Sequence, residues 1–188
     1  MEIDDSQNVQ ACQEGNHEGF GKLYDKYVEK IYNFVYYRIQ HKETAEDLSS
    51  LIFTKALEKI NSFNASKASF STWLYRIARN SVIDYYRTNK PTDDIEAGYE
   101  ISFKQNIEAE IDAKAQLEKV KKYLNTLPER QRDIILMRVW DGLSHQKISE
   151  ILEISEGNCK MTFCRAMEKL RTELGTALIL YLLLITKM

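Results

Sequence analysis

The spacing of apolar positions predicts helices along most of the chain. Between residues 20 and 39, apolar side chains recur every three or four residues and fall on one stripe, so a core helix is expected there. A second helix is expected to open at Thr44, whose hydroxyl can cap it while Asp47 returns the bond. The inward face of that helix would consist of Ala45, Leu48, Ile52, Ala56 and Ile60.

A third periodic segment, residues 70–87, carries two different faces. Leu74, Ala78 and their neighbours at helical spacing would face a core, and Ser71 or Thr72 could cap the start. Arginine alternates with aromatic and amide residues on the other face, at Trp73, Tyr75, Arg76, Arg79, Asn80, Tyr85, Tyr86 and Arg87. Such a mixture can neutralise phosphates, stack on unpaired bases and hydrogen-bond their edges. Ordinary packing with a solvated rim is the alternative.

The segments on either side of this helix are polar. Residues 62–69 are small and polar and read as a loop. After Arg87 the run Asn89, Lys90 and Pro91 breaks the helix, and acidic residues then outnumber basic ones up to residue 113. This stretch is expected to be a solvated acidic linker between two domains.

The second half carries the pattern of a helix-turn-helix. Pro128 suits the first position of a helix that ends near Trp140. Ser144 would cap a short helix, and Ser155 a second one. On that second helix the buried stripe would be Cys159, Phe163, Ala166 and Leu170. The outward residues would be Asn158, Lys160, Met161, Thr162, Arg165 and Lys169, with the early ones placed to enter a major groove.

Composition narrows the class of protein. Two prolines and seven glycines in 188 residues favour an all-helical chain of two small domains. A net charge of −2 means that any basic surface is local. The three cysteines and three histidines have no metal-ligand spacing, and no nucleophile-base set or phosphate-binding glycine loop is present. We therefore expect no enzyme activity, no metal and no cofactor, and reduced thiols in a cytoplasmic protein.

The chain ends in an apolar run, residues 175–188, that is shorter than the roughly 20 residues of a membrane-spanning helix. Packing on the second domain or docking to a partner is favoured over membrane contact, because Lys187 is the single basic anchor nearby.

Three segments resemble parts of extracytoplasmic-function sigma factors, the small two-domain members of the bacterial sigma-70 family. FSTWLYRIARNSVIDYYR resembles the promoter-melting segment, and AEDLSSLIFTKALEKI is similar to the helix that docks on core RNA polymerase. The run from Leu127 to Arg171 resembles the domain that binds the minus-thirty-five element. The resemblance implies an all-α fold with domains at residues 8–90 and 114–174, joined by a linker at 91–113.

The resemblance also implies which residues make contact. It implies that Asp47 and Leu48 bind the polymerase. Ser50 and Leu51 occupy the positions just downstream, where the family commonly has Gln and Glu. A plain amphipathic helix is the alternative there. The minus-ten element, with a base flipped into a pocket, would be held by Phe63, Asn64, Lys67, Trp73, Arg76, Arg79 and Asn80. Asp84 and Arg87 are three residues apart and are expected to pair, which favours a structural role for Arg87; a direct phosphate contact is the alternative.

The minus-thirty-five element would be held by Asn158, Lys160, Met161, Thr162 and Arg165. Met161, Thr162, Cys164 and Met167 are less polar or less basic than the family pattern, so a weaker grip or a changed sequence preference is expected. The hypothesis is an alternative sigma factor that binds core RNA polymerase and promoter DNA and is held inactive by an anti-sigma factor. A polymerase-independent helix-turn-helix regulator is the alternative.

Overall fold

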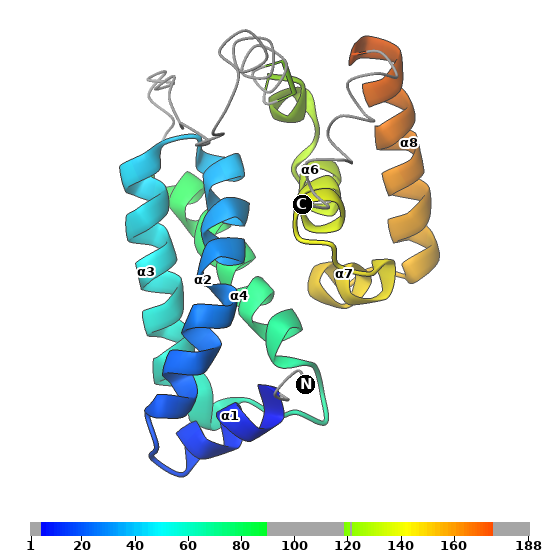
Figure 1. Ribbon diagram of the computed structural model, residues 1–188. Coiled ribbons are helices and arrows are strands. Elements are labelled where there is room, and N and C mark those ends of the chain that lie inside the picture. Colours follow the sequence, from blue (N-terminus) through cyan, green and yellow to red (C-terminus); the bar gives the residue numbers. More distant parts are fainter. Residues whose placement is uncertain (1–4, 90–118, 121, 175–188) are drawn as a thin grey trace, which may run out of the picture. The chain divides into compact units, whose positions relative to one another are not determined.

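The computed structural model describes residues 5–89, 119, 120 and 122–174 of the chain. The chain divides into two compact units, residues 1–96 and 97–188. Every regular element of the described residues is helical (Figure 1), which confirms the predicted all-α class. The acidic stretch 91–113 and the apolar tail 175–188 lie outside the described residues.

The first unit is a helical bundle with one short helix across its end. Its elements are α1 (Asp5–Gln13), α2 (Glu18–Ile39), α3 (Lys42–Lys59), the 3₁₀ turn η1 (Ile60–Ser62) and α4 (Phe70–Thr88). Helices α2, α3 and α4 pack on one another, and α1 lies against α2, η1 and α4 (Figure 1). The core they share is fully closed to solvent at Leu23, Ile31, Phe34, Ile52, Leu74 and Tyr75. The predicted helix over residues 20–39 and the predicted inward face of α3 are confirmed.

Helix α3 begins three residues earlier than predicted, because its cap is residue 41 and not Thr44. The cap is His41, whose Nδ1 accepts a hydrogen bond from the Thr44 amide at 3.2 Å. Thr44 therefore lies inside the first turn, and its hydroxyl contacts the same imidazole nitrogen at 2.9 Å. An imidazole acceptor here satisfies one of the amides that open a helix, as a hydroxyl would have done.

Helix α4 also begins earlier, at Phe70. The Ser69 hydroxyl accepts a hydrogen bond from the Thr72 amide at 3.2 Å, so Ser69 is the cap. The prediction of a cap at Ser71 or Thr72 was wrong, because both residues lie in the first turn with buried side chains.

The second unit contains a helix-turn-helix. Residues 119, 120 and 122–126 are helical, and α6 (Glu129–Ile135) continues into the π-helical turn η2 (Leu136–Trp140). Helices α7 (His145–Leu152) and α8 (Glu156–Leu174) follow. Helix α7 contacts η2, and α8 packs on both α6 and α7. Pro128 immediately precedes α6, whereas it was predicted to be the first residue of this helix.

The two predicted caps of the helix-turn-helix are confirmed. The Ser144 hydroxyl accepts from the Lys147 amide, and the Ser155 hydroxyl accepts from the Asn158 amide, both at 3.2 Å. Between the helices Glu153 has a φ of 55°, a left-handed conformation that turns the chain sharply. On α8, Cys159, Ala166 and Leu170 are buried as expected, while Phe163 is half-buried.

Candidate nucleic-acid interface

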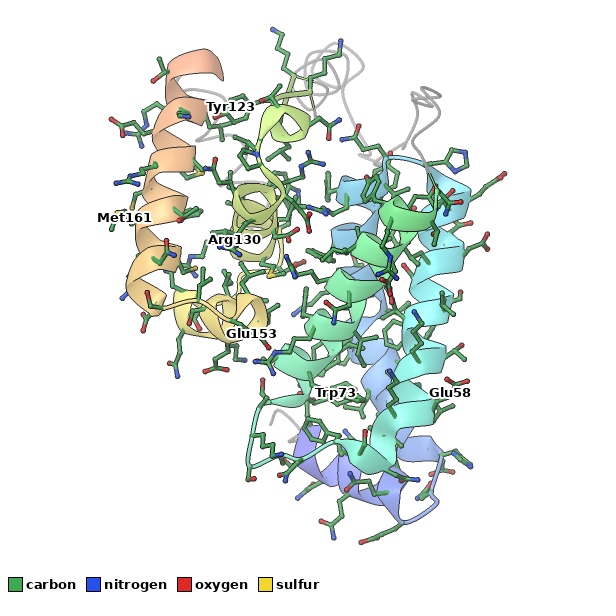
Figure 2. All side chains as sticks on the ribbon, turned by 180° about the vertical axis from the view of Figure 1, so that it is seen from behind. Glu58, Trp73, Tyr123, Arg130, Glu153 and Met161 are labelled. Atoms are coloured by element: carbon green, nitrogen blue, oxygen red, sulfur yellow. The ribbon has the colours of Figure 1, made fainter. Side chains whose placement is uncertain are left out.

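Three aromatic rings cluster where the loop of residues 63–69 enters α4. The ring centroids of Phe63 and Trp73 are 5.3 Å apart, and Phe70 lies 5.9 Å from Phe63 and 5.7 Å from Trp73. Phe63 and Phe70 are buried, whereas Trp73 is half-buried at the beginning of α4 (Figure 2). Trp73 is therefore the member of the cluster whose ring is open to solvent.

A glutamine on α1 holds the backbone next to this cluster. The side-chain amide of Gln13 donates to the carbonyl of Ile60 at 2.9 Å and to the carbonyl of Phe63 at 3.0 Å. Both hydrogens of the amide group are used. Sequence reasoning missed this contact, because its partners lie 47 and 50 residues away and no local pattern marks them.

Trp73, Arg76 and Asn80 follow one another along a single face of α4. They are three and four residues apart, the spacing that places side chains in line on a helix. Asn80 is exposed and Arg76 is half-buried. Arg79, also half-buried, lies one turn from Arg76. The face thus offers in sequence an aromatic ring, a cation and an amide.

The loop before α4 is organised by Asn64. Its Oδ1 accepts from the Ser66 amide at 2.9 Å and from the Ser66 hydroxyl at 2.7 Å, and its carbonyl accepts from the Lys67 amide at 3.0 Å. Asn64 and Lys67 are both exposed. Asn64 therefore shapes the turn that presents Lys67, and its side-chain oxygen is engaged within the loop.

Two tyrosines of the predicted stacking face are engaged inside the protein. Tyr75 is fully buried, with its ring centroid 5.7 Å from that of Phe34, so its assignment to an outward face was wrong. The Tyr86 hydroxyl donates to the Arg38 carbonyl. The predicted pair is present: Arg87 lies 3.1 Å from the Asp84 carboxylate.

The candidate polymerase-binding residues on α3 differ in exposure. Asp47 is exposed, whereas Leu48 is buried in the core of the unit. Leu51 has 45% of its surface exposed, and the Ser50 hydroxyl donates to the Glu46 carbonyl at 3.0 Å. The exposed surface of α3 at this point therefore includes Asp47, Ser50 and Leu51.

The candidate minus-thirty-five residues lie on the outer side of α8. Asn158, Lys160, Met161 and Arg165 are exposed and Thr162 is half-buried. The Lys160 ammonium is 2.7 Å from the Glu156 carboxylate, and the Thr162 hydroxyl donates to Asn158 Oδ1 at 3.1 Å. All five predicted residues thus lie between the first turn and the middle of one helix.

Two titratable groups lie beneath this surface. Burial, followed by the nearby charges of Arg138 and Lys160, lowers the pKa of His145, whose ring packs edge-on against Phe163. Burial also raises the pKa of the Cys159 thiol. Both groups are therefore neutral near pH 7, and both pack beneath the outer surface of α8.

The part of the chain that the structure describes contains no group of three or more His, Cys, Asp or Glu side chains arranged to hold a metal ion. Within the same residues, no helix combines the length and apolar character needed to cross a membrane.

Family models match both units. Residues 23–92 match sigma-70 region 2, and residues 117–170 match sigma-70 region 4. These two matches and the helix-turn-helix define a protein of the sigma-70 family.

The relatives narrow the class. The chain is 34% identical to the ECF RNA polymerase sigma factor SigW of Bacillus subtilis, over 93% of this chain and 98% of SigW. It is 31% identical to the ECF sigma factor BldN of Streptomyces coelicolor over 86% of this chain, and the match spans 62% of BldN. The chain therefore belongs to the extracytoplasmic-function group, alternative sigma factors that direct RNA polymerase to promoters.

A solved structure has the same fold. It contains CnrH in complex with the cytosolic domain of CnrY, and it superposes with a TM-score of 0.70 at 21% identity over 89% of this chain and 95% of that chain.

Proposed function

We propose that this sigma factor opens promoters with the face of α4 that begins at Trp73 and anchors on duplex DNA with α8. The observation that carries the proposal is the line of Trp73, Arg76 and Asn80, which starts at the aromatic cluster. Residues 8–90 would form the minus-ten and polymerase-binding domain, and residues 114–174 the minus-thirty-five domain. Neither step needs enzyme activity.

Melting at the minus-ten element would rest on captured bases. Flipping a base out of a duplex costs a few kcal/mol. Stacking on an aromatic side chain returns about 1–3 kcal/mol per base, and hydrogen bonds to the base edge add to this. Trp73 can supply the stacking and Asn80 the hydrogen bonds, while Arg76, Arg79 and Lys67 supply positive charge. Phe63 and Asn64 would set the shape of the loop beside the captured base.

Anchoring at the minus-thirty-five element would use the early residues of α8. Arg165 and Lys160 are the cations of this set, and Lys160 shares its charge with Glu156 at 2.7 Å. Each phosphate contact adds to the affinity for DNA and to its salt dependence. This small set of cations therefore predicts a modest affinity that falls only slowly as the salt concentration rises.

Binding to core polymerase would use the surface of α3 around Asp47. An anti-sigma factor is a natural partner for the same unit, because Leu51 exposes 45% of its surface one turn from Asp47, and Tyr24 and Leu57 expose 42% and 39% elsewhere on the unit. Such a partner would cover the polymerase-binding surface and keep the protein inactive in the cytoplasm.

Run-off transcription with purified core polymerase tests the proposal. Fragments of the source genome are transcribed with and without the protein, and new transcripts with defined starts are expected. Changing Trp73 and Asn80 to Ala is expected to lower these transcripts by about 5- to 150-fold, the range that corresponds to one lost stacked base. A template with a pre-opened bubble at the minus-ten element should restore much of the signal, because the cost of unpairing is then removed.

Trp73→Phe is the matched control, since it keeps an aromatic ring and should keep most of the activity. Equal transcription by the Ala variants would contradict the role of α4. No transcripts at all, with retained duplex binding, would favour a regulator that works without polymerase.

A further inference from the structure

A line of uncharged residues runs along the middle of the outer side of α8. Gly157, Met161 and Cys164 follow one another at intervals of four and three residues, so they share one face of the helix. Met161 exposes 51% of its surface, the largest value among the large apolar side chains of the described residues. Figure 2 shows it on the side of α8 that points away from α6. Cys164 is exposed beside it.

Basic side chains flank this line. Arg165 and Lys169 lie on one side of it, and Lys160 lies on the other. Within the described part of the chain, Arg165 and Lys169 have no ion-pair partner, whereas Lys160 is paired with Glu156. Glu168 ends the line one turn after Cys164 and would repel a phosphate, which limits close contact with DNA to the first turns of α8.

A helix that enters a major groove meets phosphates at its flanks and base edges along its centre. The apolar group on base edges in that groove is the C5-methyl of thymine. Guanine and adenine edges present hydrogen-bonding atoms there, which a thioether and a thiol recognise weakly. The centre of α8 is therefore matched in polarity to thymine methyl groups.

We propose that Met161, with Cys164 beside it, determines specificity for thymine in the minus-thirty-five element by contact with the C5-methyl group. The inference rests on the proposed binding of α8 to duplex DNA and adds the base that it reads. Gly157 contributes by leaving room: a Cβ built on it meets no atom within 4 Å. No packing inside the protein therefore requires glycine there, and its absent side chain lets the first turn of α8 approach the base edges closely.

The test removes the methyl group from the DNA. Holoenzyme, formed from core polymerase and the full chain, is titrated with duplex fragments of a promoter found by run-off transcription. In each fragment one thymine of the minus-thirty-five region is replaced by deoxyuridine, which lacks the C5-methyl. At a contacted thymine the affinity is expected to fall about fourfold, the value of one buried methyl group.

The same titration with Met161→Ala identifies the side chain. Its affinity for the thymine fragment should fall by a similar factor, and deoxyuridine should then cause no further loss at that position. Met167→Ala is the matched control, because Met167 is half-buried on a different side of the same helix and should leave the thymine preference intact.

Failure of the inference and failure of the proposed function give different results in these titrations. Equal affinity for thymine and deoxyuridine at every position, an unchanged preference in Met161→Ala, or a minus-thirty-five element without thymine would each overturn the inference and leave the proposed function standing. If the wild-type holoenzyme shows no sequence-specific binding to the duplex, both the proposed role of α8 and the inference are overturned.

Discussion

The faces of α4 and α8 differ in how far their side chains are engaged with the protein. On α4, Trp73 contacts two buried phenylalanines and Tyr75 lies wholly in the core. On α8, Met161 and Arg165 are exposed, and the buried stripe is a separate set of residues. Under the proposed roles, promoter melting and folding would share Trp73 in the first unit, whereas DNA anchoring and folding would use separate residues in the second.

The largest expected effect is on the stability of the first unit. Tyr75→Ala should lower its free energy of unfolding by about 3–5 kcal/mol, because a fully buried ring is replaced by a cavity. Urea unfolding is followed by the fluorescence of Trp73 in a Trp140→Phe background, which reports on the first unit alone. Tyr85→Ala, at a half-buried position of the same helix, should cost less. Equal effects of the two variants would mean that Tyr75 is not a core residue.

The next effect is on anchoring. Arg165→Ala should lower the affinity of holoenzyme for minus-thirty-five duplex severalfold and reduce the salt slope by about 1, while the unfolding of the second unit stays unchanged. Arg171→Ala, an exposed position near the end of α8, is the control and should change the slope less. A fall in thermal stability with Arg165→Ala would break the separation between anchoring and folding.

A smaller effect is expected at α3. The double change Ser50→Gln and Leu51→Glu should raise the affinity for core polymerase severalfold, since it restores the pair that the family commonly has. Both positions are exposed, so little packing is lost. The affinity is measured by titrating labelled protein with core polymerase. Leu57→Glu, on another side of the same helix, should produce no gain, and a gain there would point to charge alone.

The smallest effect is the pH dependence of the second unit. The pKa of His145 is lowered on folding, so the unfolded chain binds more protons than the folded one just below the ordinary pKa of about 6.5. Stability from this residue is therefore complete above about pH 6.5 and is lost as pH falls toward the folded pKa. Thermal unfolding at pH 7.5 and 5.5 should show this loss, and His145→Gln should reduce it. An identical pH dependence in the variant would assign the loss to other groups.

Much of the fold could be predicted from periodicity. Apolar spacing located α2, the inward face of α3 and both helices of the helix-turn-helix. It misplaced Tyr75 because α4 packs on both α2 and α3, and two neighbouring helices bury a wider face than one stripe. The start of α4 was ambiguous because Ser69, Ser71 and Thr72 all carry hydroxyls, and only the backbone at Ser69 has the extended conformation of a cap.

The candidate site was predicted less completely than the fold. Residue types on α4 and α8 indicated DNA contact, because aromatic and basic side chains are recognisable in sequence. The contact of Phe63 with Phe70 and Trp73 could not be predicted, because it depends on where a loop returns to the bundle. Long-range contacts of this kind leave no local pattern.

The bond from Gln13 has a consequence for exchanging domains between sigma factors. The match to region 2 begins at residue 23, so a chimaera cut at that limit would omit α1 and the donor that it carries. The carbonyls of Ile60 and Phe63 would then lose their protein partner, and the loop of the recipient would no longer be held as it is here. A transplant of promoter specificity from this protein must therefore include residues 5–22.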